Sequence, residues 1–187
     1  AQAPKPVPSP VAALGRAMVQ VQLAASKLGG VGGVAAYHTS VLLDGEEFSF
    51  SPSGISRASG AASHASATHG LQVRPMGASD RSAQQLLATV GPYFEPGTYD
   101  PARKNCNSFS DAALFFLLRK RLDPEYRSAE RLGSAMPPAL AQLFTGGAYA
   151  PNPRAANFNL ETAIRELDPE RHWQTPGRTA SAGGAGA

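Results

Sequence analysis

Two stretches near the start of the chain alternate apolar and polar side chains. Residues 19–23 read Val-Gln-Val-Gln-Leu, and in residues 38–43 Thr39, Val41 and Leu43 occupy every second position. An alternation of this kind indicates a half-buried β-strand. Asp44-Gly45 comes directly after the second stretch and is a strong signal for a two-residue hairpin turn. The pattern therefore predicts a strand followed by a β-hairpin.

The predicted hairpin fixes a register for its two strands. With Asp44-Gly45 as the turn, the facing pairs are Leu43–Glu46, Val41–Phe48, Thr39–Phe50 and His38–Ser51. One face of the hairpin is then mostly apolar, and the other face is largely polar. His38 begins the polar face, a placement that suits a side chain that must reach a cleft.

A glycine-rich segment, GGVGGVAA, separates the two alternating stretches. Its residues 30–35 satisfy the G-x-G-x-x-A pattern of dinucleotide-binding folds and follow a predicted strand. That pattern requires a helix next, because the helix N-terminus binds the pyrophosphate. A strand pattern follows here instead. We therefore interpret the segment as a loop and expect no dinucleotide site.

Helical spacing appears in two later segments. Ser79 or Asp80 is the predicted cap of a helix that runs to about Val90. A second helix is predicted to begin at Cys106, with Asn105 or a neighbour as its cap. The residues that share its apolar face are Cys106, Phe109, Ala113, Phe116 and Leu117. Basic residues follow this helix, where the negative end of its dipole favours cations.

The composition of both ends differs from that of the middle. Residues 1–16 are rich in proline and residues 146–187 in Ala, Pro, Asn and Gly, so both bury too little apolar surface to offset their ordering entropy. We expect a flexible lead-in at 1–16, a folded body at 17–145 and a largely disordered tail at 146–187, with a short helix only at 160–167. Within the body, the Ser, Ala, Gly and His content of residues 51–78 predicts a mobile surface loop.

Composition and charge narrow the function classes. The chain has 187 residues, enough for one domain, and its net charge of +3 comes from scattered basic residues, so we expect no nucleic-acid binding. A single cysteine excludes an internal disulfide framework and favours a reducing cytoplasm or nucleus. The chain shows no basic-then-apolar leader and no apolar stretch of roughly 20 residues, so neither secretion nor a membrane span is expected. His64 and His69 have too few neighbouring ligands for a metal site, and no cofactor is expected.

The lone cysteine has two interpretations. In the first turn of a helix, free backbone N–H groups and the positive end of the dipole favour a thiolate, and the same N–H groups can bind a developing oxyanion. Cys106 in that position is a candidate nucleophile. The alternative is that Cys106 packs in the core, because free cysteine is among the most buried residue types. His38 likewise is either a general base or a structural histidine.

Two segments taken together resemble a known family. The pairing of YHTSVLLDGEEFSFSPSGI with KNCNSFSDAALFFLL resembles the PPPDE family of permuted papain-fold peptidases, which includes the desumoylating isopeptidases, over residues 18–144. The resemblance implies an α+β fold, permuted papain-like, with a small antiparallel sheet and packed helices. It also implies a closing helix at 136–144 and a catalytic dyad of Cys106 and His38. The chain departs from relatives at residues 51–55, in the low-complexity stretch 58–70, and at Tyr37, where relatives often carry Trp.

The resemblance implies a cysteine isopeptidase that releases a ubiquitin-like modifier, SUMO or ubiquitin, from lysine through a thioester intermediate. Two alternatives stay open: an S-acyl protein thioesterase, and a catalytically silent binding module. Asn105 and Asn107 are candidates for binding the oxyanion or supporting the dyad, and Asn107 is equally a candidate for capping the helix; the group that orients the histidine is left unassigned. The expected partners are modifier conjugates or S-acylated proteins in the cytoplasm or nucleus, and a homodimer is one assembly open to the chain.

Overall fold

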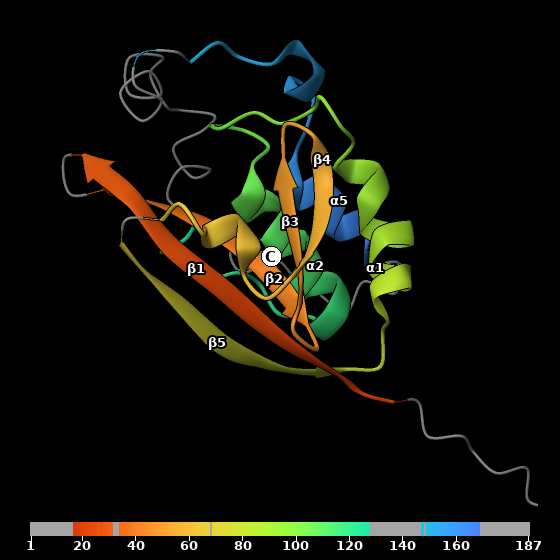
Figure 1. The fold of residues 1–187 in the computed structure, drawn as a ribbon. Helices are drawn as coiled ribbons and strands as arrows, with labels where there is room; N and C mark the ends of the chain where they lie inside the picture. The colour runs from red at the N-terminus through yellow and green to blue at the C-terminus, as the bar shows by residue number, and fades with distance from the viewer. Residues whose placement is uncertain (1–16, 32–33, 68, 128–146, 148, 169–187) are drawn as a thin grey trace, which may run out of the picture.

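The computed structural model describes residues 17–31, 34–67, 69–127, 147 and 149–168. Its described residues form a five-stranded antiparallel sheet in the order β4-β3-β2-β1-β5. The strands are β1 (Val19–Val31), β2 (Val34–Leu43), β3 (Glu46–Ser51), β4 (Gly54–Ser59) and β5 (His69–Ser79). Helices α1 (Ala83–Val90), α2 (Cys106–Leu118) and α5 (Leu160–Glu166) pack beside the sheet (Figure 1). The predicted α+β class with a small antiparallel sheet is confirmed.

The predicted hairpin is confirmed at its turn end. β2 pairs with β3 in the register Val41–Phe48, Leu42–Glu47 and Leu43–Glu46. The predicted pairs of Thr39 with Phe50 and His38 with Ser51 lie beyond the last of these, because the two strands separate there and the start of α2 bonds to β2 instead. The pairing of β2 with β3 therefore ends before it reaches His38.

The glycine-rich segment continues the strands. β1 runs to Val31 and β2 begins at Val34, so the segment expected to be a loop forms the outer end of a long β1–β2 hairpin. The register shifts between Lys27 and Gly29, where Gly29 has a φ of 150°. The strand β2 follows the glycines, where the G-x-G-x-x-A pattern requires a helix.

The prediction of a mobile loop at 51–78 is wrong for most of that segment. It forms β4, the short 3-10 helix η1 (Ala62–His64) and β5, which pairs with β1 along the other edge of the sheet. Small side chains allow the chain to lie close to its neighbours here. Gly54 has a φ of 94°, and a Cβ at that position would lie 2.9 Å from the Pro96 side chain, so only glycine fits the turn between β3 and β4. The side chains of Ser63 and His64 bond into the sheet, as described below.

The two predicted helices are present, with one shifted start. α1 is capped by Ser82, whose hydroxyl accepts from Gln85 N–H at 3.2 Å while Gln85 Oε1 accepts from Ser82 N–H at 2.8 Å. The predicted cap Ser79 ends β5 instead, and its hydroxyl donates to the Leu117 carbonyl at 2.7 Å. α2 is capped by Asn105 as predicted.

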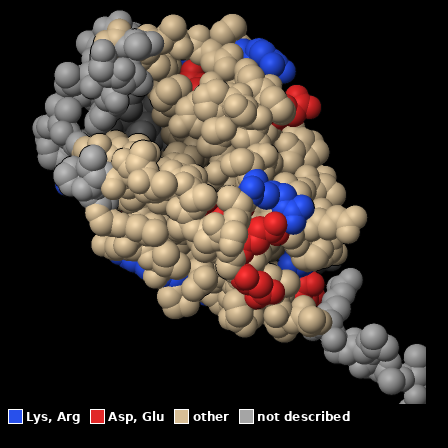
Figure 2. Space-filling view, in the orientation of Figure 1, with Lys and Arg blue, Asp and Glu red and all other residues tan. Residues whose placement is uncertain are grey.

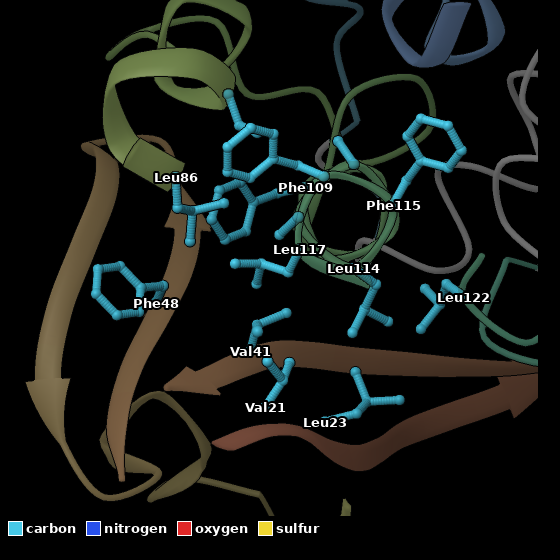
Figure 3. Close-up of a cluster of buried hydrophobic side chains, with 14 of the residues drawn as sticks. Val21, Leu23, Val41, Phe48, Leu86, Phe109, Leu114, Phe115, Leu117 and Leu122 are labelled. Carbon is cyan, nitrogen blue, oxygen red and sulfur yellow. The ribbon is translucent and has the colours of Figure 1, made fainter. Parts of the chain in front are cut away.

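The hydrophobic core lies between one face of the sheet and α2 (Figure 3). Val21, Leu23 and Val41 project from the sheet toward Leu114 and Leu117 of α2, and all five side chains are buried. The rest of α2 is enclosed as well, since α1 and α5 also pack against it. The predicted one-sided apolar face is therefore incomplete, because a helix covered from several directions buries its whole circumference.

Residues expected in a disordered tail complete this core. The short 3-10 helix η3 (Pro153–Ala155) and α5 lie in the predicted tail, and α5 confirms the short helix expected at 160–167. Ile164 and Leu167 are buried in the main cluster, and Phe158 packs against it. Residues 149–168 thus belong to the folded body, because a few well-placed apolar side chains bury enough surface despite the polar composition. The predicted closing helix at 136–144 lies outside the described residues.

Acidic and basic side chains lie beside one another on the face shown in Figure 2, and uncharged residues cover most of that face. Among the ion pairs of the described residues, Arg57 and Glu46 have side chains 2.7 Å apart. Within the described residues, no helix has both the length and the apolar character needed to cross a lipid bilayer.

Candidate active site

Cys106 is the first residue of α2, and the Asn105 side chain holds the start of that helix in place. Asn105 Oδ1 accepts hydrogen bonds from the backbone N–H of Asn107 at 2.9 Å and of Ser108 at 3.1 Å. Its Nδ2 donates to the Pro101 carbonyl at 2.9 Å. Both ends of this amide are therefore used in capping. The sulfur stands in the first turn, where the positive end of the helix dipole favours a thiolate.

A tight turn leads the chain into the cap. Asp100 is fully buried, and its Oδ1 accepts from the backbone N–H groups of Ala102 and Arg103, each at 2.9 Å. Asp100 Oδ2 accepts from the backbone N–H of Asn152 at 2.9 Å. The C-terminal segment thereby supports the turn that precedes Cys106. Sequence analysis missed this support because Asn152 lies in the expected tail.

Tyr99 lies beside the thiol and was not identified from the sequence. Its hydroxyl is hydrogen-bonded to the side chain and to the backbone of Cys106. Burial, and then the neighbouring Cys106, raise the pKa of Tyr99 well above its ordinary value, so the hydroxyl keeps its proton. The Tyr99 ring lies 5.4 Å from that of Phe50, and its carbonyl accepts from Asn152 Nδ2 at 2.9 Å. The turn at 100–104 brings Tyr99 close to Cys106, and no local sequence pattern predicts this contact.

The surroundings of the thiol distinguish the two interpretations of Cys106. The residue is 5% exposed, which fits a core cysteine and a protected nucleophile equally well. Its Sγ donates to Asn107 Oδ1 at 3.7 Å and it also contacts the Tyr99 hydroxyl, whereas the main hydrophobic cluster is formed by other residues. Polar neighbours at a helix start are typical of a reactive cysteine, so the geometry favours the nucleophile.

Asn107 joins the helix that carries Cys106 to the strand that carries His38. Its Oδ1 accepts from Thr39 Oγ1 at 2.8 Å, and its Nδ2 donates to the Tyr37 carbonyl at 3.2 Å. These partners stand immediately before and after His38 in β2. Asn107 therefore ties both sides of His38 to the residue next to the thiol, while the capping role belongs to Asn105.

His38 projects from the other face of the sheet, since its neighbour Thr39 points toward α2. The His38 Nε2 lies 2.8 Å from Ser63 Oγ, and its ring lies 4.5 Å from that of His64. Burial, followed by repulsion from His64, lowers the pKa of His38 to about 4, although Glu47 acts in the opposite direction. The imidazole is neutral at pH 7 as a result, which is the form that can accept a proton from a thiol.

Cys106 and His38 belong to elements on opposite sides of the sheet, because α2 lies on the face toward which Thr39 points. Asn107 of α2 bonds to β2 on both sides of His38, and the Tyr99 ring lies tilted, 5.4 Å from the ring of Phe50 in β3. These contacts hold the start of α2 next to the segment of β2 that contains His38. A direct hydrogen bond between the imidazole and the thiol stays a prediction.

The two remaining described histidines occupy different settings. His64 is buried and hydrogen-bonded within the sheet, so its assignment to a flexible loop is wrong. His69 begins β5, where its backbone pairs with that of Lys27. Among the described residues, no three His, Cys, Asp or Glu side chains form a group that could hold a metal ion.

The comparisons with known proteins bear on this site directly. A family model described as "PPPDE putative peptidase domain" matches residues 13–139, a span that includes both His38 and Cys106. No curated protein matches the chain. The matched span covers most of the chain, and the antiparallel sheet with its packed helices agrees with the permuted papain-like fold of that family. The chain therefore belongs to the PPPDE peptidase family.

Proposed function

We propose that this protein is a cysteine isopeptidase that releases a ubiquitin-like modifier from lysine side chains. The observation that carries the proposal is the pair of hydrogen bonds that the Asn107 side chain makes with Thr39 and Tyr37, which we call the Asn107 clamp. The clamp ties the chain on both sides of His38 to the first turn of the helix that begins at Cys106. A base and a nucleophile must keep a fixed relative geometry, and this tether supplies it from rigid elements. Family membership supports the peptidase class.

The proposed reaction follows from the residues at the site. Neutral His38 accepts the proton of the Cys106 thiol, and the thiolate attacks the carbonyl carbon of the isopeptide bond. As the tetrahedral intermediate collapses, the C–N bond breaks and the protonated His38 returns the proton to the lysine amine. The modifier is then held as a thioester on Cys106. Water, with His38 again as base, cleaves the thioester and releases the modifier carboxylate and the free thiol.

Tyr99 and the Cys106 backbone N–H are the donors that we assign to the oxyanion of this intermediate. The Tyr99 hydroxyl contacts both the sulfur and the backbone N–H of Cys106, so it stands where negative charge would develop. Asn105 is left out of this assignment, because both ends of its side-chain amide hold the start of α2 in place. Asn107 acts in this scheme as a positioning residue.

A polar groove beside the site favours a peptide over an acyl chain. The groove has a volume of about 330 Å³ and is lined by Tyr37, the residue before His38, and by the charged or amide side chains of Lys27, Gln72, Arg74 and Glu125. Such a lining offers hydrogen-bond partners to the extended backbone of a modifier C-terminus. An S-acyl chain would gain little there, because it needs an apolar surface to bury.

Turnover assays on three matched substrates test the proposal. The substrates are a SUMO–lysine isopeptide conjugate, a ubiquitin–lysine isopeptide conjugate and an S-palmitoylated peptide, each incubated with the wild-type protein, Cys106→Ser and Cys106→Ala. We expect cleavage of an isopeptide conjugate that both substitutions abolish, because a serine hydroxyl is far less acidic than the thiol. Cleavage of only the S-acyl peptide would contradict the isopeptidase proposal and favour an S-acyl thioesterase. Cleavage of none would identify a binding module, and wild-type rates in Cys106→Ala would refute the mechanism.

A further inference from the structure

A continuous chain of hydrogen bonds leads from His38 to a buried carboxylate. His38 Nε2 lies 2.8 Å from Ser63 Oγ, and Ser63 Oγ lies 2.6 Å from Glu47 Oε1. The Ser63 backbone N–H donates to Glu47 Oε2 at 2.8 Å. The residues come from three elements, β2, η1 and β3, so only the folded sheet brings them together.

The directions of these bonds follow from the number of protons available. An ionised carboxylate can only accept, so the single hydroxyl proton of Ser63 goes to Glu47. Ser63 Oγ must then accept from His38, which places a proton on His38 Nε2. In a neutral imidazole the other nitrogen, Nδ1, then carries the lone pair. The chain of bonds therefore selects the tautomer and leaves Nδ1 as the basic atom.

The carboxylate at the end of this chain is held rigidly. Glu47 is 1% exposed, and Ser40 Oγ donates to it at 2.6 Å in addition to the two bonds from Ser63. Burial acts to raise the pKa of Glu47, but the hydrogen bonds from Ser40 and Ser63 outweigh burial and keep the pKa below its ordinary value. The group is thus an anion at neutral pH.

The bonds beyond Glu47 are consistent with the same assignment. Since Ser40 donates to Glu47, it accepts from His64 Nε2, 3.0 Å away. His64 Nδ1 then accepts from Ser26 Oγ at 2.8 Å. Both arms end on Glu47, and each serine hydroxyl and each ring nitrogen of His64 along them has a hydrogen-bond partner. A buried polar network with its hydroxyls paired in this way fixes the side chains within it.

We propose that Ser63 and Glu47 are positioning residues that orient the catalytic imidazole of His38 with Nδ1 toward the Cys106 thiol and stabilise the imidazolium formed when His38 takes the thiol proton. The inference rests on the proposed function, because it takes His38 as the base. Ser63 comes from the stretch 58–70, in which this chain departs from the pattern of its relatives. That stretch, though low in complexity, supplies the link between the base and its carboxylate.

If the network only stabilised the fold, its loss would lower the free energy of unfolding without a specific effect on kcat or on the tautomer of His38. The test therefore measures kcat and the His38 tautomer in addition to stability. Ser63→Ala removes the link to His38, Ser63→Thr restores a hydroxyl, and Glu47→Gln keeps the shape of the side chain without its charge. Ser49→Ala is the matched control, because Ser49 is a buried serine of the same sheet that bonds to Ser56 at 2.8 Å and lies outside the network.

Two measurements are made on each variant, with urea unfolding to confirm that it is folded. The first is steady-state cleavage of the isopeptide conjugate, separated into kcat and KM. The second is the ¹⁵N spectrum of the His38 ring, which reports the tautomer without any substrate. We expect Ser63→Ala to lower kcat about 10- to 100-fold with little change in KM, since a misdirected base loses alignment. The Nε2–H signature of His38 should weaken in the same variant, and Ser63→Thr should restore both. Glu47→Gln should lower kcat similarly, and Ser49→Ala should match the wild type.

Failure of the inference differs from failure of the proposed function. A folded Ser63→Ala protein with wild-type kcat, or with an unchanged His38 tautomer, would overturn the positioning role while leaving the dyad intact. A wild-type protein that cleaves no conjugate would refute the proposed function, and the ring spectrum alone would then test whether Ser63 and Glu47 orient His38. A His38 tautomer that changes in Ser63→Ala would support the positioning role. A tautomer that stays the same in Ser63→Ala would overturn it.

Discussion

Acidification from pH 6.5 to about 4 is expected to destabilise this protein through His38. The pKa of His38 is lowered from 6.5 to about 4 in the folded state, first by burial and then by His64. Above pH 6.5 the ring is neutral in both the folded and the unfolded chain. As the pH falls from 6.5 to about 4, the unfolded chain binds a proton that the folded chain does not, so each step favours unfolding. Stability is thus retained above the unfolded pKa and lost below it.

The size of the effect follows from the two pKa values. Each tenfold change in proton affinity corresponds to about 1.4 kcal/mol, so a pKa lowered from 6.5 to about 4 corresponds to roughly 3 kcal/mol when fully expressed. Because the ring is partly exposed, solvent screening reduces this to roughly 2 kcal/mol. His64, whose pKa is also lowered by burial, acts in the same direction. Glu47 contributes only at lower pH, because its pKa lies below 4.5.

Urea unfolding followed by circular dichroism between pH 7.5 and pH 4 tests this reasoning. The proteins compared are the wild type, His38→Gln, which keeps a donor for Ser63, and His64→Gln. The free energy of unfolding should fall with pH in the wild type, and the fall should be smaller by roughly 2 kcal/mol in His38→Gln. Parallel curves for the wild type and His38→Gln would show that His38 binds its proton equally well in both states, and the assigned cause would be wrong.

Three further predictions concern the site and its support. Tyr99→Phe should cost about 1–3 kcal/mol in urea unfolding, since buried Cys106 loses its bonds to the hydroxyl while the ring still packs on Phe50, and should lower kcat roughly 100-fold through the loss of an oxyanion donor; unchanged kcat would remove Tyr99 from the mechanism. Asn107→Ala deletes the bonds to Thr39 and Tyr37, so it should cost about 1–3 kcal/mol in urea unfolding and lower kcat with it; a stable variant with full activity would show that the clamp is dispensable. Ile164→Ala should cost about 2–5 kcal/mol, because the side chain is 1% exposed in the main cluster; a melting temperature equal to that of the wild type would show that α5 is not part of the folded body.

Features that depend on near neighbours in the chain could be predicted from the sequence. Alternation at residues 19–23 and 38–43 identified β1 and β2, because burial on one face of a strand repeats every second residue. Asp44 and Gly45 have φ values of 48° and 84°, the left-handed conformations that this pair of residue types adopts readily in a hairpin turn. Asn105 caps α2 through bonds to the next turn, so the position of Cys106 at the helix start was also predictable.

The tertiary structure alone decided which side chains meet. The Asn107 clamp joins residues 68 and 70 positions apart, and the bond from Ser63 to Glu47 spans 16 positions. Such contacts leave no periodic trace, because their residues are chosen by where strands cross and not by local spacing. The predictions from composition were wrong for residues 51–78 and 149–168 for the same reason. Small and polar residues predict high chain entropy. The first segment is nevertheless held against the core by bonds to the buried Glu47, and the second by contacts of α5 with α2. The sequence therefore determined where the thiol and the imidazole stand along the chain, and long-range packing determined the tyrosine, amide and carboxylate that surround them.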